Sequence, residues 1–366
     1  MGIKVTFVSN YLTIHQISLC REFYVKLGTN FSFVSSFEPS GDKKKYADFE
    51  NEPFVIRSYL SKKDRMKAIR VIDESDVVIF GSGDRSLIKN KKKMIFFYLE
   101  HISKNKINRL RKFHLRMMYS KFPNAYLLCA SCYSQTDFNG IGLFLDRCFY
   151  FGYFPLLIDQ CSRYANSKYI NLLWVGRELP LKRPEYAFYA AEFLYQNGIC
   201  FKLCIVSTFD NLIKDLIEVY KSKPWFKHIK LKTPIDNTSI QKLMSKSDIF
   251  IFSSDKNEGW GAVVNEAMNG GCCPIVSREA GCSSFLIKDG INGFLFNDIG
   301  QFKDELLLSV QNRLFEKIGI NAADTIRTLW NAKTAVENLL TVFAFLIEGK
   351  DLPKRLINNG PGTKIL

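Results

Sequence analysis

Residues 247–271 read S-D-I-F-I-F-S-S-D-K-N-E-G-W-G-A-V-V-N-E-A-M-N-G-G. The apolar run at 249–252 predicts a buried strand, and the apolar spacing that follows predicts a helix over 262–270. A buried strand that passes into a helix through a glycine-rich turn is typical of open parallel sheets, which bind ligands beyond the carboxyl ends of their strands. The stretch therefore predicts an α/β fold with a ligand site at this turn.

The residues of the turn indicate what that ligand is. Gly259 and Gly261 allow the backbone around Trp260 to approach a ligand closely, and the unpaired N–H groups at a helix start favour a phosphate. Glu258 and Glu266 flank the glycines, and carboxylates accept hydrogen bonds from hydroxyl groups. Phosphates between hydroxyl-bearing groups describe a sugar nucleotide. The alternative is that both acids are solvated charges at a helix end, because acids are common there.

The same alternation of strands and helices runs through the chain and restarts after Pro155. It predicts two α/β domains, at 1–160 and 161–330, joined near 156–169, and a long final helix and tail over 331–366. The strands are expected at 3–9, 30–36, 75–81, 93–98, 125–130, 170–176, 200–206, 228–232, 247–253 and 273–277. The helices are expected at 14–28, 104–121, 184–197, 210–221, 238–246, 262–270, 283–288 and 332–348.

Composition and charge restrict the class of protein. The chain has 366 residues, 47% of them apolar, and a net charge of +15. We find neither a transmembrane stretch nor a signal peptide, so we expect a cytoplasmic protein. Residues 1–160 carry a net +10 and residues 161–366 a net +5. This excess predicts an anionic partner, which is a nucleic acid, a membrane surface or a phosphorylated substrate.

Cysteines and glycine motifs argue against several alternatives. Cys129 and Cys132 form one C-x-x-C without a second pair, so buried reduced thiols are favoured over a zinc or redox site. No RNA-recognition or zinc-finger pattern supports a nucleic-acid partner. The first strand is followed by S-N-Y-L-T-I-H-Q, which lacks the G-x-G-x-x-G of NAD enzymes.

A second charged motif follows the strand at 170–176. Its sequence V-G-R-E-L-P-L-K places Arg177 and Lys182 beyond the carboxyl end of that strand, where two cations would face a diphosphate. Taken alone, an Arg and a Lys in a turn are usually surface charges. Because both this pair and the two glutamates follow strands of the second domain, we expect them to lie in one shared site.

The two motifs together, V-G-R-x-x-x-x-K and E-G-W-G-x-x-x-x-E, resemble the donor site of retaining GT-B glycosyltransferases of family 4. The stretches A-S-C-Y-S-Q-T-D-F, F-G-Y-F-P and the final N-N-G-P-G-T-K are similar to a bacterial subgroup found in surface-polysaccharide clusters. The resemblance implies two Rossmann-like domains facing each other across a cleft, with the C-terminal helix returning to the N-terminal domain. It covers most of the chain.

The resemblance also implies roles for individual residues. Arg177 and Lys182 would neutralise the donor diphosphate as leaving group, and Glu258 would contact the donor sugar. The backbone of 259–261 would approach sugar and phosphate, and Glu266 would bind the ribose. Cations and a helix end supply the positive charge, so neither a metal nor a cofactor is expected. The sequence departs from the family at C-I-V-S-T-F-D, where G-D-G is usual, and at G-C-S-S-F-L, which lacks a glutamate.

Three residues of the first half are candidates for the acceptor side. His15 lies in the loop after the first strand, where it would contact donor phosphate or acceptor, or would be a surface histidine. Glu100 and His101 end another strand, where such enzymes often keep an acceptor-side polar residue. The segment 104–121 holds seven Lys or Arg among apolar residues. It would lie on an anionic membrane or pack its apolar stripe on the sheet.

These features predict a cytoplasmic, membrane-peripheral, retaining glycosyltransferase. It would move a sugar from a nucleoside-diphosphate donor to a glycan acceptor, lipid-linked by expectation, in capsule, O-antigen or related polysaccharide synthesis. The alternative is a GT-B sugar-nucleotide epimerase, an isomerase that needs no acceptor. The sequence leaves the base, the sugar, the acceptor and the linkage open.

Overall fold

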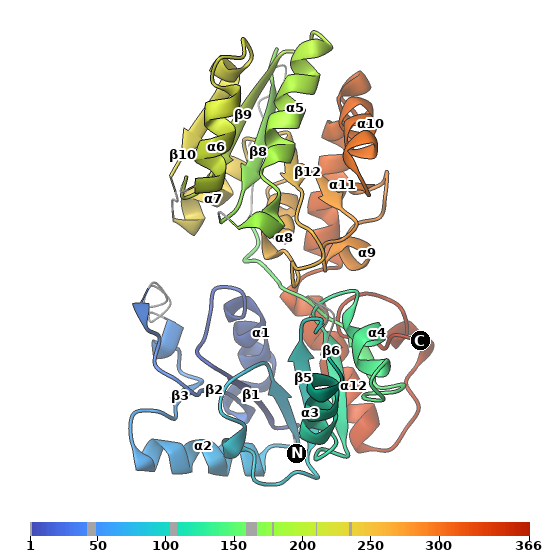
Figure 1. Ribbon diagram of the computed structural model, residues 1–366. Coiled ribbons are helices and arrows are strands. Elements are labelled where there is room, and N and C mark those ends of the chain that lie inside the picture. The colour runs from blue at the N-terminus through green and yellow to red at the C-terminus, as the bar shows by residue number, and fades with distance from the viewer. Residues whose placement is uncertain are drawn as a thin grey trace. The chain divides into compact units, whose positions relative to one another are not determined.

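The computed structural model describes residues 2–41, 49–102, 108–158, 167–177, 179–209, 211–233 and 236–366. The chain divides into two compact units (Figure 1). The first is Met1–Pro155 with Trp330–Leu366, and the second is Leu156–Leu329. The first unit thus ends near the predicted linker, and the C-terminal segment groups with it.

The first unit is built on a parallel sheet with strand order β3-β2-β1-β4-β5-β6-β7 in its described part. Its strands are β1 (Val5–Ser9), β2 (Phe31–Ser35), β3 (Val55–Arg57), β4 (Val77–Phe80), β5 (Met94–Leu99), β6 (Ala125–Cys129) and β7 (Cys148–Tyr150). Its helices are α1 (Ile17–Leu27), α2 (Lys62–Glu74), α3 (Arg109–Tyr119), α4 (Ser134–Asn139) and α12 (Ala332–Ile347). Helix α12 packs against α1.

The second unit is also a parallel sheet covered by helices, with strand order β10-β9-β8-β11-β12-β13 in its described part. Its strands are β8 (Ile170–Val175), β9 (Phe201–Val206), β10 (Ile229–Lys232), β11 (Ile249–Phe252), β12 (Cys273–Ser277) and β13 (Phe294–Phe296). Its helices are α5 (Glu185–Gln196), α6 (Asn211–Tyr220), α7 (Asn237–Met244), α8 (Ala262–Asn269), α9 (Ser283–Leu286), α10 (Ile299–Val310) and α11 (Leu314–Thr328).

Both sheets reverse their strand order at the same place. In the first unit the chain adds strands on one side of β1 and then continues on the other side with β4, and β8 and β11 repeat this in the second unit. The central strands are apolar runs because both faces are buried; β4 and β11 are buried at every position. Each unit is therefore a Rossmann-like α/β domain with a topological switch point, between β1 and β4 in the first and between β8 and β11 in the second.

The predicted elements are found within a few residues of their expected bounds, apart from the segment 104–121. There the helix begins only at Arg109, and residues 103–107 lie outside the described part. The elements that the sequence analysis did not identify are β3, β7, β13, α2, α4, α10 and α11.

Candidate functional site

Two of the predicted donor-site residues form an ion pair at the switch point of the second unit. Lys182 follows β8, Glu258 follows β11, and the Lys182 ammonium donates a hydrogen bond to Glu258 Oε2. Both side chains are largely buried, at 13% and 15% exposure. The pairing brings together two residues that are 76 positions apart in the sequence.

A hydroxyl group holds the loop that carries Lys182. Ser253 is buried after β11, and its Oγ lies 2.8 Å from the carbonyl oxygens of Lys182 and Arg183. The same oxygen accepts a hydrogen bond of 3.3 Å from the indole N–H of Trp174 in β8. The backbone N–H of Asp255 also donates to the carbonyl of Leu181, at 2.8 Å. The two loops beyond β8 and β11 are therefore fixed to each other.

The ring of Phe252 brings the start of α8 near the ion pair. The Lys182 ammonium lies 5.5 Å from the centre of this ring. Gly261, the N-cap of α8, has a φ of +97°. A Cβ on Gly261 would lie 2.5 Å from the Phe252 ring. Glycine is thus required at 261 by backbone conformation and by this close packing.

The side chain of Trp260 packs inside the second unit and does not lie on the surface of the turn. It is buried, its indole N–H donates to Asn265 Oδ1 at 2.7 Å, and its ring lies edge-on to Phe285. Its carbonyl accepts a hydrogen bond from the N–H of Cys282. Trp260 therefore fixes the turn that positions Glu258 and Gly261.

Glu266 and Arg177 differ sharply in environment. Glu266 lies within α8, is 8% exposed and accepts a hydrogen bond of 3.1 Å from Asn237 Nδ2 at the start of α7. Burial raises the pKa of Glu266, and the bond from Asn237 opposes that shift. Arg177, two positions after β8, is exposed. The predicted contacts of both with a ligand stay predictions.

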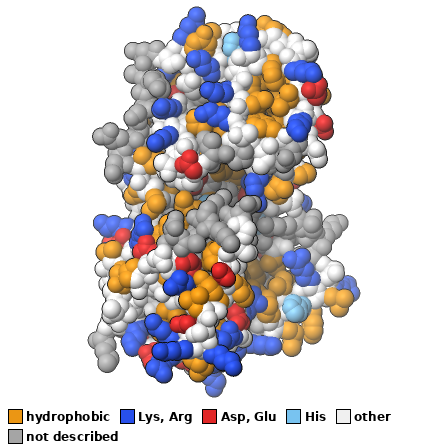
Figure 2. Space-filling view, turned by 90° about the vertical axis from the view of Figure 1, so that its left-hand side faces the viewer, with side chains coloured by type: hydrophobic (Ala, Val, Ile, Leu, Met, Phe, Trp, Pro, Cys, Tyr) orange, Lys and Arg blue, Asp and Glu red, His pale blue; other side chains and the backbone are white. Residues whose placement is uncertain are grey.

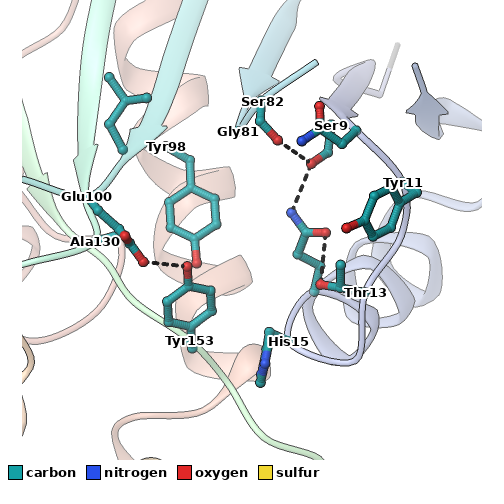
Figure 3. A pocket seen from close by; sticks show the side chains of 13 residues that line it. Ser9, Tyr11, Thr13, His15, Gly81, Ser82, Tyr98, Glu100, Ala130 and Tyr153 are labelled. Atoms are coloured by element: carbon teal, nitrogen blue, oxygen red, sulfur yellow. Dashed lines mark hydrogen bonds between the residues drawn. The ribbon is translucent and has the colours of Figure 1, made fainter. Parts of the chain in front are cut away.

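A polar pocket occupies the matching position in the first unit. It has a volume of 380 Å³ and lies beyond β1, β4, β5 and β6 (Figure 3). Ser9 Oγ lies 3.2 Å from Ser82 Oγ and accepts a bond of the same length from Gln16 Nε2. On the other side the Tyr153 hydroxyl donates to Glu100 Oε1 at 2.9 Å. Hydroxyl, amide and carboxylate groups therefore converge on one hollow.

Two of the three acceptor-side candidates line this pocket. Glu100 points toward Tyr153, and the His15 ring lies 5.5 Å from the Tyr153 ring, edge-on (Figure 3). Burial lowers the pKa of His15, because it disfavours the charged form of the ring. His101 does not line the pocket. It is buried, with Nδ1 3.0 Å from Ser131 Oγ and its ring against Tyr133.

Helix α3 exposes an apolar stripe. Leu110, Phe113 and Met117 share one face and are 79%, 64% and 52% exposed. These three side chains do not pack on the sheet, whereas Leu115 and Met118 of the same helix are half-buried and Tyr119 is buried. No described helix is long and apolar enough to cross a membrane.

Neither a metal cluster nor a disulfide occurs in the described residues. None of their His, Cys, Asp and Glu side chains gather in a group of three or more that could hold a metal ion. The cysteines in the described ranges are free thiols. Cys129 is buried, which raises its pKa well above the usual value. Most of the described cysteines are buried, Cys132 and Cys204 are half-buried, and Cys200 is exposed.

The comparisons with known proteins agree with this architecture. Residues 162–324 match the family model "Glycosyl transferases group 1". HepE of Anabaena, solved with UDP-glucose, aligns with a TM-score of 0.65 and 14% identity over 95% of this chain and 100% of that one. The fold is GT-B. The stretch that matches this family model lies within the second unit.

Two further GT-B structures align over nearly the whole chain. A glycosyltransferase from Rickettsia africae has a TM-score of 0.68 and 14% identity, and covers 95% of this chain and 100% of its own. The lipopolysaccharide outer core galactosyltransferase WaaB has a TM-score of 0.65 and 16% identity, and covers 95% and 99%. No match was found among curated protein sequences.

Several residues that shape the two sites were not identified from sequence. The sequence placed Phe252 and Ser253 only at the end of a predicted strand. It gave Tyr153 only as part of the stretch F-G-Y-F-P. One signal was present, because polar residues at or just beyond the carboxyl ends of parallel strands gather at one edge of their sheet. Ser9 ends β1 and Ser82 lies two positions after β4 in the first unit, and Ser253 directly follows β11 in the second.

Proposed function

We propose that the protein is a retaining, metal-independent glycosyltransferase that moves a sugar from a nucleoside-diphosphate donor to a glycan acceptor. The observation that carries this proposal is the Lys182–Glu258 pair at the switch point of a group 1 domain. A switch point is where open α/β sheets bind nucleotides. Family 4 membership and a role in surface-polysaccharide synthesis are part of the proposal and rest on the sequence motifs.

The pair is suited to a donor that carries both negative charge and hydroxyl groups. The ammonium of Lys182 has three donor hydrogens, so it bonds a phosphate oxygen while it keeps Glu258. Glu258 Oε1 then accepts from a sugar hydroxyl. Arg177, exposed beside this loop, adds a second cation for the leaving diphosphate, on which negative charge grows as the glycosidic bond breaks. Glu266 is proposed to hold the ribose hydroxyls.

The pocket of the first unit is proposed to bind the acceptor. Its lining groups are neutral or anionic hydrogen-bonding groups, which suit sugar hydroxyls better than phosphates. His15, with its lowered pKa, is available to accept a proton, and Glu100 is held by Tyr153. Same-face attack, with the departing phosphate taking the acceptor proton, accounts for retention without an enzyme nucleophile.

A thermal-shift screen of sugar nucleotides tests the donor site, because a true donor stabilises the folded state in proportion to its occupancy. UDP sugars are screened first, since HepE was solved with UDP-glucose. A donor should raise the Tm of the wild type and not that of Lys182→Met. If no sugar nucleotide gives this difference, the proposal fails. NMR of that donor incubated alone distinguishes the epimerase, which would convert it without an acceptor.

We also propose that α3 attaches the first unit to an anionic membrane, where a lipid-linked acceptor resides. Exposed Leu110, Phe113 and Met117 form the apolar face, and Arg109, Arg111, Lys112 and Arg116 lie on the same helix. An amphipathic helix of this kind inserts its apolar face at the headgroup boundary, and its cations attract anionic lipid.

Vesicle sedimentation tests this attachment. Leu110→Ser/Phe113→Ser should weaken binding to phosphatidylglycerol vesicles by about tenfold or more, because two apolar side chains no longer enter the lipid. Val25→Ser/Met66→Ser is the matched control, since both side chains are exposed on other helices of this unit. Equal binding by the two double variants, or no binding by the wild type at low salt, would contradict the attachment.

A further inference from the structure

A hollow rich in lysine lies in the second unit, away from the donor site. It has a volume of 400 Å³ and is formed by the starts of β8 and β9, by β10 and by the end of α7. Lys182 and Glu258 lie beyond the opposite, carboxyl ends of β8 and β11. The basic residues that line this lysine groove are Lys202, Lys227, His228, Lys230, Lys232 and Lys246.

The sheet pairing explains why the groove stays open. Lys202 pairs with Asn171, and Lys230 pairs with Cys204, so all four side chains point to one face of the sheet. The other face packs on α5 and α6 in the core. Helix α7 ends at Met244, and Leu243, Lys246 and Ser247 form one wall of the groove.

Five lysines line the groove, and the acid bound beside it is Asp248, which accepts hydrogen bonds of 2.8 and 3.1 Å from the backbone N–H and Nδ2 of Asn171. The lining of the groove contains no Asp or Glu, and none of the five lysines forms an ion pair within the described ranges. Lys202 instead stacks on Tyr169, with its ammonium 4.6 Å from the ring centre. Figure 2 shows Lys and Arg side chains gathered around an apolar area on the face of this unit that is in view. Concave surfaces of one charge concentrate the opposite ion.

We propose that this lysine groove is a second anion site, and that it binds a phosphate-bearing group. Lysine ammonium groups bind phosphate as point charges, and five of them line the groove. A volume of 400 Å³ is in the range of small-ligand sites. The proposal stands apart from the proposed glycosyl transfer, because none of its residues belongs to the donor site.

Calorimetry with inorganic tripolyphosphate tests the groove. The experiment uses Lys182→Met as background, so that the donor site contributes little to the signal. Lys202→Gln/Lys230→Gln should weaken binding by about tenfold or more, and high salt should weaken it further. The matched control is Lys214→Gln/Lys317→Gln, which removes two exposed lysines from α6 and α11 and should change affinity by less than about twofold.

The source of the phosphate is distinguished by a second arm. Phosphatidylglycerol vesicles are added to the same variants in a Leu110→Ser/Phe113→Ser background. Groove-dependent vesicle binding identifies a lipid headgroup, whereas groove-dependent binding of tripolyphosphate alone identifies a soluble phosphate compound. The proposal is overturned if the groove and control variants bind tripolyphosphate equally, or if Lys182→Met alone abolishes that binding.

Discussion

The two units share a sheet order but differ in how they complete the crevice at the switch point. In the second unit a carboxylate, Glu258, faces the ammonium of Lys182. In the first unit a carboxylate, Glu100, faces the phenol of Tyr153. The same edge of the same fold therefore pairs an acid with a cation in one unit and an acid with a neutral phenol in the other. This difference is the one expected if the second unit binds phosphates and the first binds hydroxyl groups.

Removal of the ammonium should have the largest effect. Lys182→Met keeps much of the side-chain length but leaves the departing diphosphate without this positive charge. Loss of one preorganised electrostatic contact typically lowers kcat by about 100- to 1000-fold. Glu258 would also lose its partner while largely buried. Steady-state kinetics measure the effect, with Lys214→Met as control. A decrease in kcat of less than about threefold would contradict a role of the Lys182 ammonium in catalysis.

Replacement of the acid should separate kcat from donor affinity. Glu258→Gln removes a charged hydrogen bond to the sugar, which costs about 1.5–3 kcal/mol, or roughly tenfold or more in rate. It also frees Lys182 from its counterion, so the donor KM should stay the same or fall. The measurement is kcat and donor KM of the variant beside those of the wild type. An unchanged kcat would contradict the proposed hydrogen bond between Glu258 and the donor sugar.

The neutral site should respond through the acceptor instead. Glu100→Gln weakens the bond to Tyr153 and any bond to an acceptor hydroxyl, so acceptor KM should rise by about three- to tenfold. Donor KM should not change, because the pocket lies wholly within the first unit. Glu74→Gln, at the exposed end of α2, is the control. A rise in donor KM instead would contradict the division of roles between the units.

The sequence predicted the charged site better than the neutral one, for a physical reason. Short motifs directly after clearly apolar strands contain Arg177, Lys182 and Glu258. The strand positions therefore predict at which edge of the sheet these residues lie. The Lys182–Glu258 contact depends on loops held by Ser253 and by a left-handed residue, Arg183, with φ of +47°. Neither long-range constraint is visible in a single sequence.

The sequence identified His15 and Glu100 of the first unit's pocket, but not the serine and tyrosine residues that complete it, because such residues are common along the chain. Ser9 and Gln16 come from one segment, and Ser82 and Tyr153 come from two others, so these residues form a pocket only when the chain is folded. The same reasoning explains the missed helix α2: only Ala68 and Ile72 of its residues are buried, which leaves a weak apolar stripe. Its capping residue, Ser61, which accepts from the N–H of Asp64, was a usable signal.

The smallest expected effect concerns Glu266, where one substitution should raise the stability of the folded chain and weaken donor binding. Burial raises the folded-state pKa of Glu266 above its value in the unfolded chain. The folded state therefore binds a proton more tightly, and stability is lost as pH rises from the unfolded pKa through the folded one. At neutral pH the folded chain carries a buried charge at a cost. Glu266→Gln removes that charge and keeps an oxygen to accept from Asn237.

Glu266→Gln should thus raise the Tm at neutral pH by about 1–3 °C, and the gain should shrink toward about pH 4, where the wild-type carboxyl is protonated. The same variant should lose part of the Tm rise that a donor gives, because an amide accepts a ribose hydroxyl less strongly than a carboxylate does. Thermal unfolding at two pH values, with and without donor, measures both. If Glu266 serves the ligand, the variant should have a higher Tm and a smaller Tm rise with donor. If Glu266 serves only the fold, the variant should have a lower Tm and an unchanged Tm rise with donor.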